Sequence, residues 1–194
     1  MNTAKKLSLW LIAAAFAVAL FQSKSYAASS QTVTIQVSIN ATKSLAVNVS
    51  TYNYGALGVN VSSIATPIVV TNDSLALRES YALQGANAVS TAGGTTWTLA
   101  SSTGSLDTYA MAVQFSSAAP TNVDASWPAG TNLTTSVQNC TTGSTFGNGT
   151  VGESCFQVFP TGTYAVRNMW VRMKTPVSVT DTTQRQTSIV LTIQ

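Results

Sequence analysis

Histidine is absent from this chain of 194 residues. Histidine provides the base of Ser-His-Asp triads and Cys-His dyads, and it is a frequent ligand of zinc and iron. Its absence therefore excludes these catalytic arrangements and all His-ligated metal centres. The sequence also contains no G-x-S-x-G motif, no glycine-rich phosphate loop that ends in Lys-Ser/Thr, and no S-x-x-K motif.

Charged residues are scarce, at 8% of the chain. Three of the nine Lys and Arg residues lie in the first 27 positions, so residues 28–194 carry six basic and six acidic side chains. Nucleic acids and anionic lipid surfaces are held mainly by clustered Lys and Arg. Because residues 28–194 have no basic excess, we expect no nucleic-acid partner.

The six acidic residues are dispersed along the sequence: Asp73, Glu79, Asp107, Asp124, Glu153 and Asp181. Glycosidases work with carboxylates alone, but they need two of them across the scissile bond. Asn72, Asp73 and Asp181 could supply oxygen ligands to Ca²⁺, yet no D-x-D-x-D spacing is present. We therefore predict a protein that is not an enzyme and that has no cofactor or metal.

The N-terminus has the order of features found in a Sec-type signal peptide. Lys5 and Lys6 precede an apolar run of fifteen residues, Leu7–Phe21, and the small-residue exit ends at Ala27. A membrane-spanning helix needs about twenty apolar residues. We therefore predict a signal peptide over residues 1–27 and no membrane insertion after its removal. The protein is expected to be secreted, to the cell surface or the exterior, with the periplasm as the alternative.

Only two cysteines are present, Cys140 and Cys155. In an exported protein such a pair most often forms a disulfide. A metal or redox pair is the competing interpretation, but the spacing is not C-x-x-C and no histidine accompanies it. We predict a structural disulfide.

The residues that follow the leader alternate between apolar and polar side chains over Thr32–Asn40. Val33, Ile35, Val37 and Ile39 form one face, and polar residues form the other. A period of two with β-branched enrichment predicts a strand with one buried face. Further runs of this kind are Leu45–Val49, Ile68–Thr71, Glu79–Leu83, Trp97–Ala100, Tyr109–Phe115, Cys155–Phe159, Tyr164–Lys174 and Thr187–Gln194.

Short strands between turn-rich segments, without a helical period after the leader, predict an all-β sandwich or barrel over residues 28–194. Two stretches are predicted to be long loops, Gly85–Thr96 and Ala118–Gly152. Loops of this length usually bind a ligand, move, or need a tether. The predicted disulfide would tether the second, which makes residues 118–155 an insertion in the domain.

Tyr52–Gly58 places an aromatic-Gly turn before the run Pro67–Asp73, which ends in Thr-Asn. The segments Met169–Pro176 and Gln184–Gln194 have the pattern of closing strands. Together these motifs resemble bacterial secreted immunoglobulin-like surface proteins. The resemblance implies a single immunoglobulin-like, Greek-key β-sandwich with a surface role and no catalytic residues to transfer.

The function we predict is that of a non-catalytic structural subunit of a filament, pilus-like fibre or surface coat. Its partners would be copies of itself or other surface proteins. A strand at a sheet edge has unpaired backbone groups and can complete the sheet of a neighbour. The predicted assembly strands lie near the two ends of residues 28–194, with the apolar residues Val33, Ile35, Val37, Ile39, Ile189, Leu191 and Ile193. The alternative is that both segments pair within one domain.

A binding module is the second hypothesis. An adhesin or carbohydrate-binding domain would stack glycans on exposed aromatic rings. The candidate stacking residues are Trp127, in the long loop, and Tyr52 and Tyr54.

Overall fold

The computed structural model describes residues 36–37, 42–147, 150 and 152–194. Asn40–Gln194 form one compact unit. The regular elements of the described residues are strands and three short 3₁₀ turns, which confirms the predicted all-β class. The predicted strand Thr32–Asn40 lies outside the described residues apart from Gln36 and Val37, which have no regular structure.

The larger sheet has the order β1-β3-β9-β7-β6. Neighbouring strands in this order are antiparallel except β6 and β7, and β2 also pairs with β9. The bounds are β1 Leu45–Val47, β2 Ser62–Ile64, β3 Ile68–Asn72, β6 Thr98–Ala100, β7 Thr108–Phe115 and β9 Val166–Lys174.

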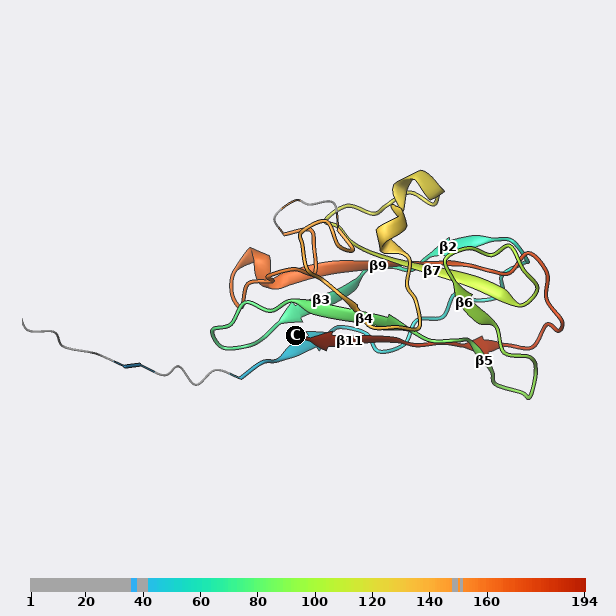
Figure 1. The fold of residues 1–194 in the computed structure, drawn as a ribbon, viewed down its shortest axis with the longest axis horizontal. Coiled ribbons are helices and arrows are strands. Elements are labelled where there is room, and N and C mark those ends of the chain that lie inside the picture. Colours follow the sequence, from blue (N-terminus) through green and yellow to red (C-terminus); the bar gives the residue numbers. More distant parts are fainter. Residues whose placement is uncertain (1–35, 38–41, 148–149, 151) are drawn as a thin grey trace, which may run out of the picture. The chain divides into compact units, whose positions relative to one another are not determined.

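The second layer consists of a sheet with the order β11-β4-β8 and a short ladder of β10 with β5 (Figure 1). The bounds are β4 Tyr81–Gly85, β5 Val89–Ser90, β8 Gln138–Asn139, β10 Arg185–Gln186 and β11 Ile189–Ile193.

The β10–β5 ladder extends the β11–β4 ladder across a β-bulge. Between the pairs Gly85↔Ile189 and Val89↔Gln186, three residues of one strand face two of the other. The Tyr109 hydroxyl donates to the carbonyl of Ala86 in this bulge, so the buried ring of β7 fixes the bend.

The core lies between the two layers because each strand turns its apolar face inward. On β7, Tyr109, Met111, Val113 and Phe115 are buried at every second position, as the period of a strand requires. From the other layer, Tyr81 and Leu83 of β4 face them and are fully buried. Leu133 of the long loop is also fully buried in this core.

The segment 118–155 carries the 3₁₀ turns η1 (Asp124–Ser126) and η2 (Ala129–Thr131) and strand β8. The predicted disulfide between Cys140 and Cys155 is present, with a Cα–Cα distance of 5.8 Å. Both cysteines are buried in the core, so the bridge holds this long connection against the sandwich.

Most predicted strands appear within a few residues of their predicted bounds, but Cys155–Phe159 is wrong. That segment makes only one isolated bridge, Val158 to Glu79. Cys155 and Val158 are buried in the core and Phe156 packs against it, and a sequence pattern cannot distinguish such burial from burial in a strand. The short strands β2, β5, β8 and β10 were not predicted, since two or three residues carry too little periodicity.

Candidate functional site

The segment 118–155 closes one lateral side of the sandwich. The Leu133 N–H donates to Met111 O at 2.8 Å, and the Phe115 N–H donates to Phe146 O at 2.7 Å, so the insertion covers the edge of β7 beyond β6. From there the chain crosses to the other layer, where β8 pairs with β4. On this side β7 and β4 therefore have partners along both of their edges.

On the opposite side, no strand of the described residues pairs with the outer edge of either sheet. There β1 is the edge of one sheet and β11 is the edge of the other. The Lys43 ammonium bonds to the Gln194 carbonyl, which ties the start of β1 to the end of β11. We call β1 and β11 together the open edge (Figure 1).

The backbone of β11 has hydrogen-bonding groups directed out of the sheet. The Gln194 N–H donates to Ser80 O at 2.9 Å, which sets the phase of the β11–β4 ladder. In an antiparallel ladder every second residue turns its N–H and C=O away from the partner strand. At β11 these residues are Ile189, Leu191 and Ile193. Such a row is a template for a further strand.

The same three residues turn their side chains toward the core but are only half-buried. On β1, Leu45 packs against the core, while Val47 is 44% exposed and Val49, just beyond the strand, is 39% exposed. Inward-facing apolar side chains stay accessible here because no strand of the described residues covers the space between the two edges. A strand with one apolar face would bury them.

The chain enters the domain at one end of the open edge. We call this end the base and define it by Ser44, Leu75, Glu79 and Gln194. The Ser44 N–H donates to Glu79 Oε1 at 3.0 Å, and Asp73 N–H donates to Ser44 O at 3.2 Å. These bonds fix the start of the domain at the base. We call residues 28–41, which precede it in the sequence, the N-terminal segment.

Glu79 is the one buried acidic side chain at the base. It is 1% exposed, and its Oε2 has no hydrogen-bond partner among the described residues. Burial raises the pKa of Glu79 above its ordinary value, and the Ser44 N–H and the Lys43 charge offset this only in part.

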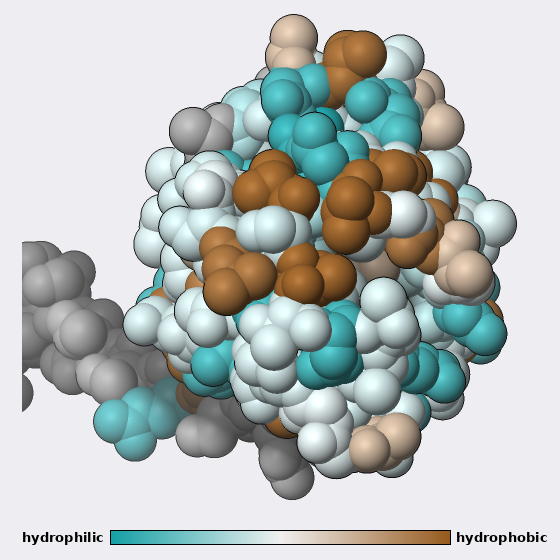
Figure 2. All heavy atoms as spheres, turned by 90° about the vertical axis from the view of Figure 1, so that its right-hand side faces the viewer, coloured by the Kyte–Doolittle hydropathy of each residue, from teal (hydrophilic) through white to brown (hydrophobic). Residues whose placement is uncertain are grey.

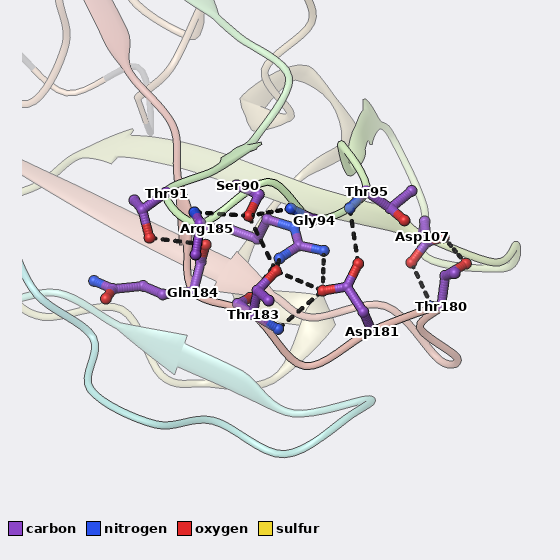
Figure 3. Close-up of polar contacts among 11 residues, drawn as sticks. Ser90, Thr91, Gly94, Thr95, Asp107, Thr180, Asp181, Thr183, Gln184 and Arg185 are labelled. Atoms are coloured by element: carbon purple, nitrogen blue, oxygen red, sulfur yellow. Dashed lines mark hydrogen bonds and ion pairs between the residues drawn. The ribbon is translucent and has the colours of Figure 1, made fainter.

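The opposite end of the sandwich is braced by a polar network (Figure 3). Asp181 accepts from the Thr183 N–H at 2.9 Å, from the Thr95 N–H at 2.7 Å and from Arg185 Nη2 at 2.7 Å. Hydrogen bonds from Thr183, Thr95 and Arg185 hold the pKa of Asp181 well below its usual range. The network joins the loop after β5 to the loop before β10.

The three predicted stacking aromatics do not form one surface. Trp127 is 5% exposed, lies over the Arg172 guanidinium at 5.3 Å and donates to Thr121 O at 2.9 Å. The expectation that it is an open loop aromatic is therefore wrong, because the insertion folds its ring onto the outer face of β9. Tyr54 is half-buried and donates to Val171 O at 3.0 Å. Tyr52 is 37% exposed and contacts Tyr54 edge-on at 4.8 Å.

Three of the acidic side chains, those of Asp107, Asp124 and Asp181, have charged or polar partners within the protein. Asp107 accepts from Thr180 N–H at 2.9 Å, and Asp124 accepts from Arg172 Nη2 at 2.7 Å. Two of the predicted calcium ligands use their side-chain oxygens in internal hydrogen bonds. Asn72 Oδ1 accepts from Ser74, and the Asp181 carboxylate accepts from Thr183 and Thr95. Within the described part of the chain, no group of three or more Cys, Asp or Glu residues is placed to hold a metal ion.

Comparison of the chain with family models, with curated proteins and with solved structures gives no match. The resemblance to secreted immunoglobulin-like surface proteins therefore stays a prediction. Among the described residues, no helix is long and apolar enough to cross a membrane. The disulfide is compatible with an extracellular protein.

Proposed function

We propose that this chain is a secreted, non-catalytic structural subunit that assembles with copies of itself into a filament, pilus-like fibre or surface coat. In this assembly the N-terminal segment of one copy is added as a strand to the open edge of the next. The observation that carries the proposal is the β11 edge, where outward-directed backbone groups and half-buried apolar side chains coincide.

The sequence of the N-terminal segment suits this edge. Its apolar residues recur at every second position from Val33 to Ile39, which is the spacing of the inward positions of β11. An added strand would therefore place these side chains between the two sheets while its backbone bonds to β11. The scarcity of charge also favours close subunit packing, because few charged groups lose water on contact.

The first experiment compares Val37→Asp with Ser38→Asp in residues 28–194. Both variants add one negative charge to the same segment at adjacent positions. In an added strand, position 37 faces the core and position 38 faces solvent. We expect sedimentation velocity and negative-stain electron microscopy to show concentration-dependent assemblies for the Ser38 variant and the unaltered chain, and monomers for the Val37 variant.

A peptide of residues 30–41 provides a second test. Added in excess, it should occupy the β11 edge and stop assembly, whereas the same peptide with Val37→Asp should not. If both peptides leave assembly unchanged, strand addition at this edge is wrong. If the unaltered chain stays monomeric at all concentrations and Val37→Asp lowers its stability, the segment pairs within its own domain and the exchange is refuted.

A further inference from the structure

Apolar side chains gather on the end of the sandwich that lies opposite the base. Val59, Val61, Leu106 and Val177 are all exposed, Val59 at 53% and Leu106 at 59%. Figure 2 faces this end and shows apolar groups together on its surface. We call these four residues the tip.

Backbone hydrogen bonds join the loops that carry the tip. The Asn60 N–H donates to Pro176 O at 2.8 Å, which places Val59 and Val61 beside Val177. The Asp107 N–H donates to Ser178 O at 3.0 Å, which brings Leu106 to the same loop. The four apolar residues therefore form one surface from three loops.

This surface is held in a fixed arrangement. Asp107 accepts from the Thr180 backbone N–H and hydroxyl, and Asp181 anchors the following residues through Thr183 and Arg185 (Figure 3). A fixed apolar surface loses little conformational entropy when it is covered. Exposed apolar clusters of this kind mark contact sites more often than isolated exposed residues do.

The position of the tip relative to β11 suggests what covers it. The ladder of β10 and β11 begins at Arg185, next to the tip, and ends at Ile193, next to the base. Nine residues of extended chain span about 30 Å, which matches Thr32–Asn40 laid along Arg185–Ile193. If the added strand runs antiparallel to β11, its C-terminal residue Asn40 lies at the tip of the accepting copy.

Only three residues then separate Asn40 from Ser44, which lies at the base of the donating copy. Three residues reach about 10 Å. The base of the donor must therefore lie against the tip of the acceptor. The base also offers an apolar residue on a turn, Leu75, which is 85% exposed.

We propose that the tip of one copy is the docking surface for the base of the next copy, so that subunits join head to tail with the added strand antiparallel to β11. The inference rests on the proposed function and names the second contact of the assembly. A contact between two different surfaces of the same chain repeats from copy to copy, and it produces a fibre where the rotation between copies does not close a ring.

The test uses residues 28–194 with Leu106→Asp and Val177→Asp together. The control is Val137→Asp, because Val137 is 58% exposed and lies on the insertion next to β8, which pairs with Ala82 and Leu83 of β4. We expect the concentration of half-maximal assembly to rise at least about tenfold in the double variant and to stay unchanged in the control. Circular dichroism and melting temperature confirm that the double variant is folded.

Peptide binding separates this inference from the proposed function. The double variant should still bind the peptide of residues 30–41 as tightly as the unaltered chain, because the β11 edge is intact. If the double variant assembles like the control, the tip contact is wrong while strand addition stands. If the unaltered chain does not assemble, the proposed function fails and the tip contact fails with it.

The orientation of the added strand relative to β11 is tested by photo-crosslinking with benzoylphenylalanine in place of Ala41. Head-to-tail packing predicts crosslinks between copies to peptides that contain Leu106 or Val177, identified by mass spectrometry. Crosslinks to peptides of another copy that contain Leu75 or Gln194 would mean parallel addition and base-to-base packing, and would overturn the proposal.

Discussion

Removal of the disulfide by Cys140→Ala and Cys155→Ala together should destabilise the domain by about 3 kcal/mol. The bridge closes a loop with a sequence separation of 15 residues. In the chain-entropy model such a loop lowers the entropy of the unfolded chain by an amount equivalent to about 3 kcal/mol at 25 °C. For a domain of this size the loss corresponds to a decrease in melting temperature of roughly 6 to 12 °C.

The buried position of the bridge adds to this loss. Cys140 and Cys155 are 1% and 0% exposed and belong to the core cluster, so the alanines also leave a small cavity. The assay is urea unfolding followed by tryptophan fluorescence, with and without a reducing agent. Reduction should destabilise the unaltered chain and leave the double variant unchanged. A double variant within about 0.5 kcal/mol of the unaltered chain would refute the reasoning, since that is the range of an ordinary surface substitution.

Three further predictions concern single polar side chains. Glu79→Gln should raise the free energy of unfolding at pH 7 and leave it unchanged near pH 4. Burial raises the pKa of Glu79, so the protein loses stability as the pH rises and this carboxyl ionises. Equal effects at both pH values in urea unfolding would contradict this. Asp181→Asn should lower the melting temperature at pH 7 and speed hydrogen exchange of the Thr95 amide. The difference in melting temperature between the variant and the unaltered chain should shrink as the pH falls below the ordinary pKa of a carboxyl. Unchanged exchange at Thr95 would refute the stabilising role of this network. Tyr109→Phe should lower the free energy of unfolding by about 1 kcal/mol, because it removes the hydroxyl that donates to the Ala86 carbonyl while that carbonyl keeps its bond from Thr187. A loss no larger than that of the exposed control Tyr164→Phe would contradict this.

The long strands could be predicted from the sequence because their periodicity is local. Tyr109–Phe115 alternates over a full buried face, and the structure places it as β7 beside β9. Cys155–Phe159 has similar apolar content but is no strand, since it makes only the isolated bridge of Val158 with Glu79 and is held against the core by the disulfide. Apolar content reports burial, whereas a strand needs a neighbour with free backbone groups.

Trp127 illustrates the same limit for a binding residue. A tryptophan beside a proline in a long loop suggested an exposed ring. The loop instead folds over β9, where Arg172, 45 positions away in the sequence, covers the ring. Exposure of a loop residue depends on where the loop packs, which its own sequence does not encode.

The alternation of Val33 to Ile39 and of Ile189 to Ile193, the missing histidine and the single pair of cysteines are properties of the sequence by itself. They determine the all-β class and the disulfide, which the structure confirms, and they predict the strand over Val33 to Ile39, because each depends on residue type and spacing alone.

Only the tertiary structure decided which edges lack a partner and where the apolar tip lies. The insertion closes one side of the sandwich, and on the other side no strand within the described part of the chain pairs with the outer edges of β1 and β11. Three separate loops bring Val59, Leu106 and Val177 together. These features arise from contacts between segments that are far apart in the chain. Such contacts depend on how complete sheets pack, and no local pattern of residues contains them.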